Sequence, residues 1–173
     1  MKRSLRTGKQ LIDDYGEVLF SDIRDFGHNI VSDFRDLDNT FKEKGIDPYF
    51  DGIIFDPPFI FGLKDTDDPR SEDYGGYTQT YAEFSGLMIS ANELFPRWLK
   101  RDGKLIVKCS DQYQTEEREF YPHHITWCRT LSKFNLIDFF IHIHHHLNPT
   151  AFQVKNRPCS VITHSYYMVF EAI

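Results

Sequence analysis

Four consecutive residues, Asp56, Pro57, Pro58 and Phe59, carry the groups in this sequence that are best suited to chemistry. They follow a hydrophobic segment typical of a β-strand, and open α/β sheets bind ligands at the carboxyl ends of their strands. Two prolines in series stiffen the backbone and remove two N–H donors, so carbonyl oxygens there can face outward as acceptors. With a carboxylate and an aromatic ring, these residues could clamp a planar group that bears an NH₂. The structural alternative is a strand ended by prolines beside a core phenylalanine.

A histidine cluster, His142, His144, His145 and His146, lies at the end of another predicted strand. His142, His144 and His146 share one face by the two-residue period of a strand. No carboxylate or cysteine stands at a recognisable ligand spacing, and alternation into solvent explains the histidines equally well. We therefore expect no metal site here.

Basic residues gather in three places that could contact substrate or phosphate. The first nine residues hold four cations, and Lys155, Arg157 and His164 lie in a second polar segment. Lys108 lies one predicted strand from Asp56, so it could approach the substrate. Scattered surface charge explains the other basic residues about as well as phosphate contacts do.

The elements that must position these residues alternate between strands and helices. Apolar patterns predict strands at Glu17–Ile23, Asn29–Phe34, Asp51–Asp56, Lys104–Ser110, Leu136–His146 and Ser165–Ile173. Helices are expected at Ser4–Tyr15, Thr80–Lys100 and Phe120–Lys133, with Pro96 breaking or kinking the second near its end. This alternation predicts an α/β sandwich around a mainly parallel sheet. Only a loop separates the last two strands, so we expect that pair to be antiparallel.

Composition limits the class of protein. The 173 residues predict one domain, residues 1–173, with a basic helix or arm at 1–16 and long loops at 62–78 and 147–164. A hydrophobic content of 40% argues against global disorder, and a net charge of −6 excludes a uniformly cationic nucleic-acid binder. Three widely spaced cysteines form neither a disulfide framework nor a thiolate zinc site. No membrane span or secretory signal is visible, so we expect a soluble cytoplasmic protein.

The segment IIFDPPF resembles the (D/N)PP(Y/F/W) motif of class I S-adenosylmethionine-dependent amino-methyltransferases, best known from DNA and RNA adenine-N6 enzymes. EVLFSDIR and NIVSDFRDL resemble the two strands that precede the motif in that fold. NELFPRWLKRDGKLIVKCSDQ resembles the helix, turn and strand that follow it, and LIDFFIHI and HSYYMVFEAI resemble the final antiparallel pair. The resemblance covers most of residues 17–173 in the expected order, and it implies a Rossmann-like sandwich.

The resemblance assigns the target amine to Asp56 and the Pro57 carbonyl, with Pro58 stiffening the corner and Phe59 stacking on the base. A base inside a duplex cannot reach such a clamp, so it must be flipped out or already single-stranded.

For the cofactor S-adenosylmethionine, the resemblance implies that Asp22 holds the ribose hydroxyls, Asp33 contacts the adenine amine, and Phe34 offers a stacking face. The alternative for both acids is a solvated carboxylate in a turn.

One departure from the family pattern concerns its glycine-rich cofactor loop, which has no match here. The segment before Glu17 offers only Thr7-Gly8-Lys9. Three explanations stay open: a truncated form, a partner chain that completes the cofactor site, or a fold that closes without the loop.

We expect an enzyme that methylates adenine N6 in DNA, with RNA as the next substrate and the Gly62–Thr78 loop covering the substrate. Cytosine N4 is less expected, because those enzymes more often carry Ser in place of Asp56. Methylation of a protein glutamine is a further alternative. A catalytically silent subunit that binds nucleic acid or a partner is the alternative from another class.

Overall fold

The computed structural model describes residues 18–22, 30–58, 80–114, 118–144 and 164–173. Contacts divide the chain into two units, residues 1–48 and 49–173, and each is described by itself. The single domain expected over residues 1–173 stays a prediction. The expected segment 1–16 and loop 62–78 lie outside the described residues, as does loop 147–164 except for its last residue.

In its described residues, the first unit contains two short parallel strands and two helical segments. Strand β1 (Ser21–Asp22) pairs with β2 (Ile30–Val31), and the 3₁₀ turn η1 (Phe34–Asp36) leads into helix α2 (Leu37–Lys44). Both strands are shorter than the segments expected from the sequence. Helix α2 was not expected, although its buried Leu37 and Phe41 have the spacing of one helical face.

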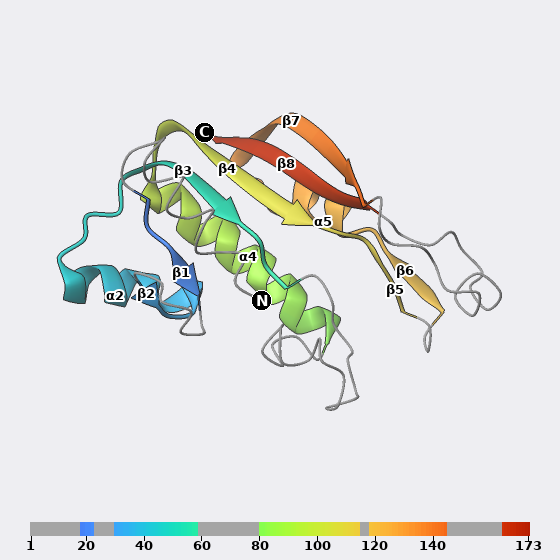
Figure 1. Cartoon of the computed structure of the whole chain (residues 1–173), viewed down its shortest axis with the longest axis horizontal. Helices are drawn as coiled ribbons and strands as arrows, with labels where there is room; N and C mark the ends of the chain where they lie inside the picture. Colours follow the sequence, from blue (N-terminus) through green and yellow to red (C-terminus); the bar gives the residue numbers. More distant parts are fainter. Residues whose placement is uncertain (1–17, 23–29, 59–79, 115–117, 145–163) are drawn as a thin grey trace. The chain divides into compact units, whose positions relative to one another are not determined.

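The second unit is built on a four-stranded mixed sheet in the order β3-β4-β8-β7 (Figure 1). Its strands are β3 (Phe50–Phe55), β4 (Leu99–Cys109), β7 (Phe134–Ile143) and β8 (His164–Ala172). Strands β3 and β4 run parallel, whereas β8 is antiparallel to both of its neighbours. The expected α/β class and the antiparallel pair at the end of the chain are both confirmed.

Helix α4 (Tyr81–Trp98) begins at a reciprocal cap, as its sequence allows. The Thr80 hydroxyl accepts a hydrogen bond from the Glu83 backbone N–H at 3.2 Å, and the Glu83 carboxylate accepts one from the Thr80 N–H at 3.0 Å. Pro96 lies inside the helix, which ends only two residues later. Because Pro96 has no N–H, the helix lacks the hydrogen bond that this position would donate to the carbonyl of Asn92.

Helix α5 (His123–Thr130) begins later than expected. Residues predicted as its first turn instead form strand β6 (Glu119–Tyr121), which pairs with β5 (Gln112–Gln114) in a hairpin. Pro122 then separates strand from helix, since it has no N–H for a sheet ladder and suits a helix start. This hairpin was not expected from the sequence.

Helices α4 and α5 cover the same face of the sheet (Figure 1). The Phe55 ring of β3 meets Phe95 of α4 at 4.9 Å and Trp127 of α5 at 5.9 Å between ring centroids. Alternate residues of the strands line this covered face and form the core, which includes Leu105, Val107, Cys109, Met168 and Phe170. Within the described residues no helix has an apolar stretch long enough to cross a bilayer.

The residues between those core positions belong to the opposite face, which we call the open face. Strand registry aligns Ile54, Ile106 and Val169 in one row across it. Ile54 is 70% exposed, so the described helices leave this row uncovered.

Candidate functional site

Asp56 lies at the carboxyl end of β3, immediately after Phe55. Phe55 points to the covered face, so alternation directs Asp56 to the open face, where its side chain is 52% exposed. Pro57 behind it is buried and Pro58 is partly buried, which anchors the backbone that carries the carboxylate. Phe59 lies outside the described residues. The carboxylate is therefore held at the sheet edge and remains accessible.

Lys108 of β4 forms an ion pair with this carboxylate, its Nζ lying 2.7 Å from Asp56 Oδ2. The adjacency expected from the sequence is confirmed, because β3 and β4 are neighbouring parallel strands. Among the hydrogen bonds of the described residues, Asp56 is engaged through Oδ2 alone. This arrangement leaves Oδ1 as an acceptor.

Two of the four clustered histidines are described, and they lie at the same edge of the open face as Lys108. The rings of His142 and His144 are 4.7 Å apart, and His144 Nε2 is 2.8 Å from the Ser165 hydroxyl. Partial burial, together with the positive fields of His142 and Lys108, lowers the pKa of His144. In the described part of the chain, no three potential ligands are arranged to hold a metal ion. His145, His146, Lys155 and Arg157 lie outside it.

The expected cofactor residues belong to the first unit. Asp22 ends β1, and Asp33 lies two residues after Val31, the residue of β2 that pairs with Asp22. Asp33 Oδ1 accepts hydrogen bonds from the Arg35 backbone N–H at 2.8 Å and from its Nε at 2.9 Å, and Nη2 lies 2.5 Å from Oδ2. Hydrogen bonding to Arg35 lowers the pKa of the Asp33 carboxyl. Phe34, which lies between Asp33 and Arg35 in the sequence, is partly buried and begins η1.

The Asp33–Arg35 contact was not expected from the sequence. It makes Asp33 the N-cap of η1, so the carboxylate has a structural role in the turn. A carboxylate has about four lone-pair sites, so Asp33 can accept a further ligand hydrogen bond without losing Arg35.

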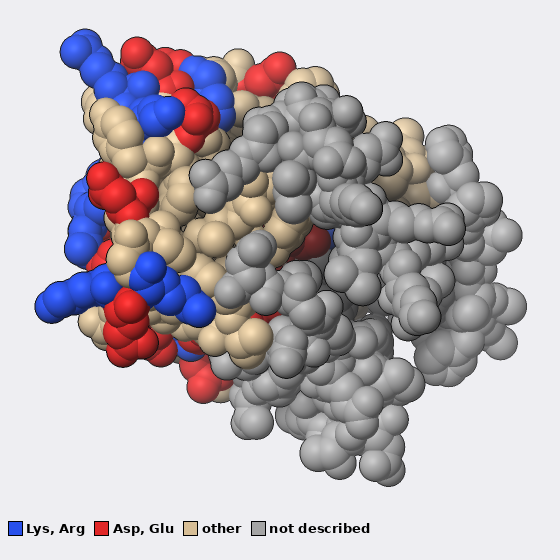
Figure 2. Space-filling view, turned by 60° about the vertical axis from the view of Figure 1, so that its left-hand side comes forward, with Lys and Arg blue, Asp and Glu red and all other residues tan. Residues whose placement is uncertain are grey.

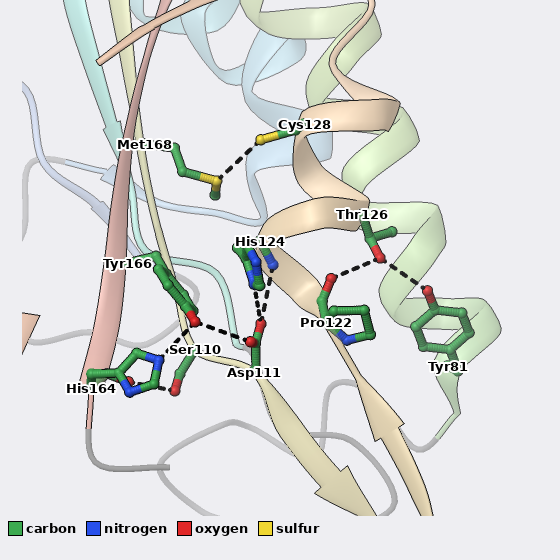
Figure 3. Close-up of polar contacts among 10 residues, drawn as sticks. All are labelled: Tyr81, Ser110, Asp111, Pro122, His124, Thr126, Cys128, His164, Tyr166 and Met168. Carbon is green, nitrogen blue, oxygen red and sulfur yellow. Dashed lines mark hydrogen bonds and ion pairs between the residues drawn. The ribbon is translucent and has the colours of Figure 1, made fainter. Parts of the chain in front are cut away.

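A second polar cluster, also missed from the sequence, surrounds Asp111 at the carboxyl end of β4 (Figure 3). The side chain of Asp111 is 4% exposed. Asp111 Oδ1 accepts a hydrogen bond from the His124 backbone N–H at 3.3 Å, and His124 Nδ1 lies 2.7 Å from the same oxygen. Asp111 Oδ2 accepts one from the Tyr166 hydroxyl at 3.2 Å. One buried carboxylate thus joins β4, α5 and β8.

The cluster continues from Tyr166 toward the beginning of β8. His164 Nε2 lies 2.7 Å from the Tyr166 hydroxyl, and the His164 carbonyl accepts a hydrogen bond from Ser110 at 2.9 Å. Burial and the neighbouring Asp111 carboxylate raise the pKa of Tyr166 to about 12. His164, expected to add positive potential to a phosphate site, is engaged in this cluster.

These contacts fix the segment that follows β4, next to the Asp56 edge. They could not be found by spacing alone, because residues more than fifty positions apart meet through the pairing of β8 with β4. The available signal was a Ser-Asp pair directly after a buried strand.

No protein-family model and no curated protein matches the sequence. The solved structures that resemble the chain include the following three. They are a provisionally assigned DNA modification methylase from Thermus thermophilus, complexed with S-adenosyl-L-methionine (19% identity, TM-score 0.43), PvuII DNA methyltransferase, cytosine-N4-specific (18%, 0.44), and a SAM-dependent methyltransferase from Archaeoglobus fulgidus (13%, 0.44). The matches cover 70%, 69% and 95% of this chain and 44%, 41% and 80% of the respective structures. The chain thus spans less than half the length of the first two.

Proposed function

We propose that this chain is an S-adenosylmethionine-dependent methyltransferase that acts on an exocyclic amine of a nucleic-acid base, with adenine N6 in DNA as the substrate. The observation that carries the proposal is the accessible Asp56 carboxylate, held by Lys108 at the carboxyl end of a parallel strand and followed by two prolines. This is the position at which open α/β sheets bind ligands.

The clamp addresses the main difficulty of methylating an aromatic amine. The amine lone pair is delocalised into the ring, which makes the nitrogen a poor nucleophile. Two acceptors, Asp56 Oδ1 and the Pro57 carbonyl, would accept hydrogen bonds from its two N–H groups and favour a pyramidal nitrogen with a directed lone pair. Phe59 would stack on the base. Acceleration then comes from positioning and electrostatics, without a covalent bond to the protein.

Lys108 has a positioning role in this scheme. Its ammonium group donates a hydrogen bond to Asp56 Oδ2, which leaves Oδ1 for the amine. An ionised carboxylate is an acceptor at both oxygens, whereas a protonated one would offer a donor to the wrong partner.

S-adenosylmethionine, when bound, supplies a methyl group on a positively charged sulfur. The acceptors on the first unit suit this molecule, because Asp22 and Asp33 follow the carboxyl ends of two paired parallel strands. Asp22 would accept hydrogen bonds from the ribose hydroxyls, Asp33 would contact the adenine amine, and Phe34 would stack on the adenine ring. A partner chain that completes this site is compatible with the absence of a glycine-rich loop.

Phosphate contacts are proposed for Lys155, Arg157 and the basic amino-terminal segment. On the face drawn in Figure 2, described acidic and basic side chains are interspersed rather than separated into a basic patch. A protein with a net charge of −6 needs local cations to hold a nucleic-acid backbone.

The decisive experiment combines cofactor binding with methyl transfer. Calorimetric titration should detect S-adenosylmethionine binding to the full chain, and a tritiated methyl group should appear in adenine-containing DNA. The Asp56→Ala variant should lose about 100-fold or more in transfer rate, as for other groups that act on the reacting centre. Asp51→Ala is the matched control: it removes the acid near the start of the same strand, where Asp51 pairs with Lys100, and should retain the rate.

Oligonucleotides that lack either adenine or cytosine will identify the base, and single-stranded and duplex forms will test for flipping. Methyl transfer to cytosine alone would contradict adenine as the substrate, but it would not contradict the proposed role of Asp56 and Pro57 in binding the target amine. Cofactor binding without transfer to DNA, RNA or a glutamine-containing peptide would favour a silent subunit. The absence of cofactor binding by the chain alone would refute the proposal for the isolated protein.

A further inference from the structure

Strand β7 is the most apolar exposed element among the described residues. Nine of its ten residues are exposed, including Leu136, Ile137, Phe139, Phe140, Ile141 and Ile143. Phe140 and Ile141 point to opposite faces of the sheet, yet they are 55% and 57% exposed. Burial on one face of the sheet therefore does not account for this composition.

Strand β7 is also an edge strand. Within the described residues it pairs only with β8, and no described strand lies along its other side (Figure 1). On β7 itself, the Phe139 N–H donates a hydrogen bond to Asp138 Oδ1 at 2.7 Å. A long apolar strand with a free edge is a template for pairing with another strand. Natural proteins usually cover such an edge or place charges along it.

An acidic side chain and a histidine flank the middle of β7 at equal distances from Phe140. Asp138, Phe140 and His142 occupy consecutive positions on the open face, opposite Val169, Tyr167 and Ser165 of β8. In an antiparallel pair centred on Phe140, Asp138 of each copy lies directly opposite His142 of the other, and the two Phe140 rings meet between them. A carboxylate and an imidazole so placed can form a hydrogen-bonded pair, and aromatic pairs stabilise cross-strand contacts.

We propose that β7 pairs with β7 of a second copy of this chain, in the antiparallel register centred on Phe140. The two four-stranded sheets then join into one continuous sheet with a twofold axis at Phe140, and the same patch serves both subunits. On the covered face this register brings Phe139 of one copy opposite Ile141 of the other. The pairing uses residues 138–142, which lie beyond the β-bulge between Leu136 and Asp138.

A charge swap tests this register. Sedimentation velocity of the wild-type chain should show a dimer in the micromolar range. His142→Asp places two carboxylates opposite each other at both ends of the contact, and it should raise the dimer dissociation constant by about tenfold or more. Adding Asp138→His to this variant recreates both acid–histidine pairs in reversed order, and it should bring the constant back to within about threefold of wild type. A monomeric wild type, or a double variant no better than His142→Asp alone, would overturn the proposal.

Cysteine cross-linking provides a second measurement that does not depend on charge. Mild oxidation of Phe140→Cys should give a covalent dimer, because the two substituted positions face each other across the axis. Leu136→Cys is the matched control, with a wild-type side chain of similar exposure (47%). Its two copies would lie about 27 Å apart, given about 3.4 Å per residue. Equal cross-linking at both positions, or none at Phe140→Cys beyond the wild-type background, would refute the pairing.

Discussion

Acid should destabilise this protein through one buried histidine, His123. Its side chain is fully buried at the start of α5, with its ring 4.4 Å from that of Phe84 and near those of Tyr81 and Tyr121. Burial lowers its pKa to about 4, against an opposing influence of Asp111 and with a small contribution from His124. Protonation of His123 therefore costs more free energy in the folded protein than in the unfolded chain.

The sign and size of the effect follow from linkage. Between pH 4 and about 6.5, His123 is protonated in the unfolded chain but neutral in the folded protein. Its full contribution to the free energy of unfolding is therefore present above pH 6.5 and decreases as the pH falls. The full difference of about 2.5 pKa units corresponds to roughly 3 kcal/mol, of which about 2 kcal/mol is lost by pH 5.

Urea unfolding at pH 7 and pH 5 measures this loss when wild type is compared with His123→Phe. Each protein is compared with itself at the two pH values, so the packing change caused by phenylalanine cancels. The variant should lose about 2 kcal/mol less than wild type between the two pH values. Equal losses in the two proteins, or an imidazole that titrates near pH 6.5 by NMR, would refute the reasoning.

Two further substitutions test the hydrogen bond from Tyr166 to Asp111 and the cap at the start of α4. Tyr166→Phe should cost about 1 kcal/mol at pH 7, because it removes a donor to buried Asp111. The raised pKa of Tyr166, about 12, means that its contribution is present below pH 10 and lost as the pH rises to 12, so the variant should show a flatter alkaline unfolding curve. Thr80→Ala should cost about 1 kcal/mol by loss of the α4 cap, whereas Thr80→Ser, which keeps the hydroxyl, should unfold near the wild-type denaturant midpoint.

The sequence predicted the elements that have strong local patterns. Strands β3, β4, β7 and β8 and helix α4 were identified from apolar runs and helical spacing, and their order predicted the antiparallel pair at the end of the chain. The β5–β6 hairpin was missed because each of its strands has only three residues, too few for a period to be visible. Pro122 was read within a helix, although it instead separates the hairpin from α5.

The candidate site was predictable only where it is continuous in sequence. Asp56 and its prolines form one motif, and Lys108 follows from the parallel pairing of β3 with β4. The Asp111 cluster depends on β8 lying between β4 and β7, an arrangement that no local spacing specifies. The resemblance assigned Asp33 to the cofactor, whereas its hydrogen bonds to Arg35 had no signal in the sequence.

The insertion of β8 between β4 and β7 also constrains how the protein can assemble. During synthesis, β4 leaves the ribosome before β8. The antiparallel pairing of β4 therefore cannot form until β8, which is made much later, is available. Helices α4 and α5 can form meanwhile, but their apolar faces have only part of a sheet to cover. Folding of this unit should therefore be governed by a late, long-range event, the docking of the β7–β8 hairpin onto β4.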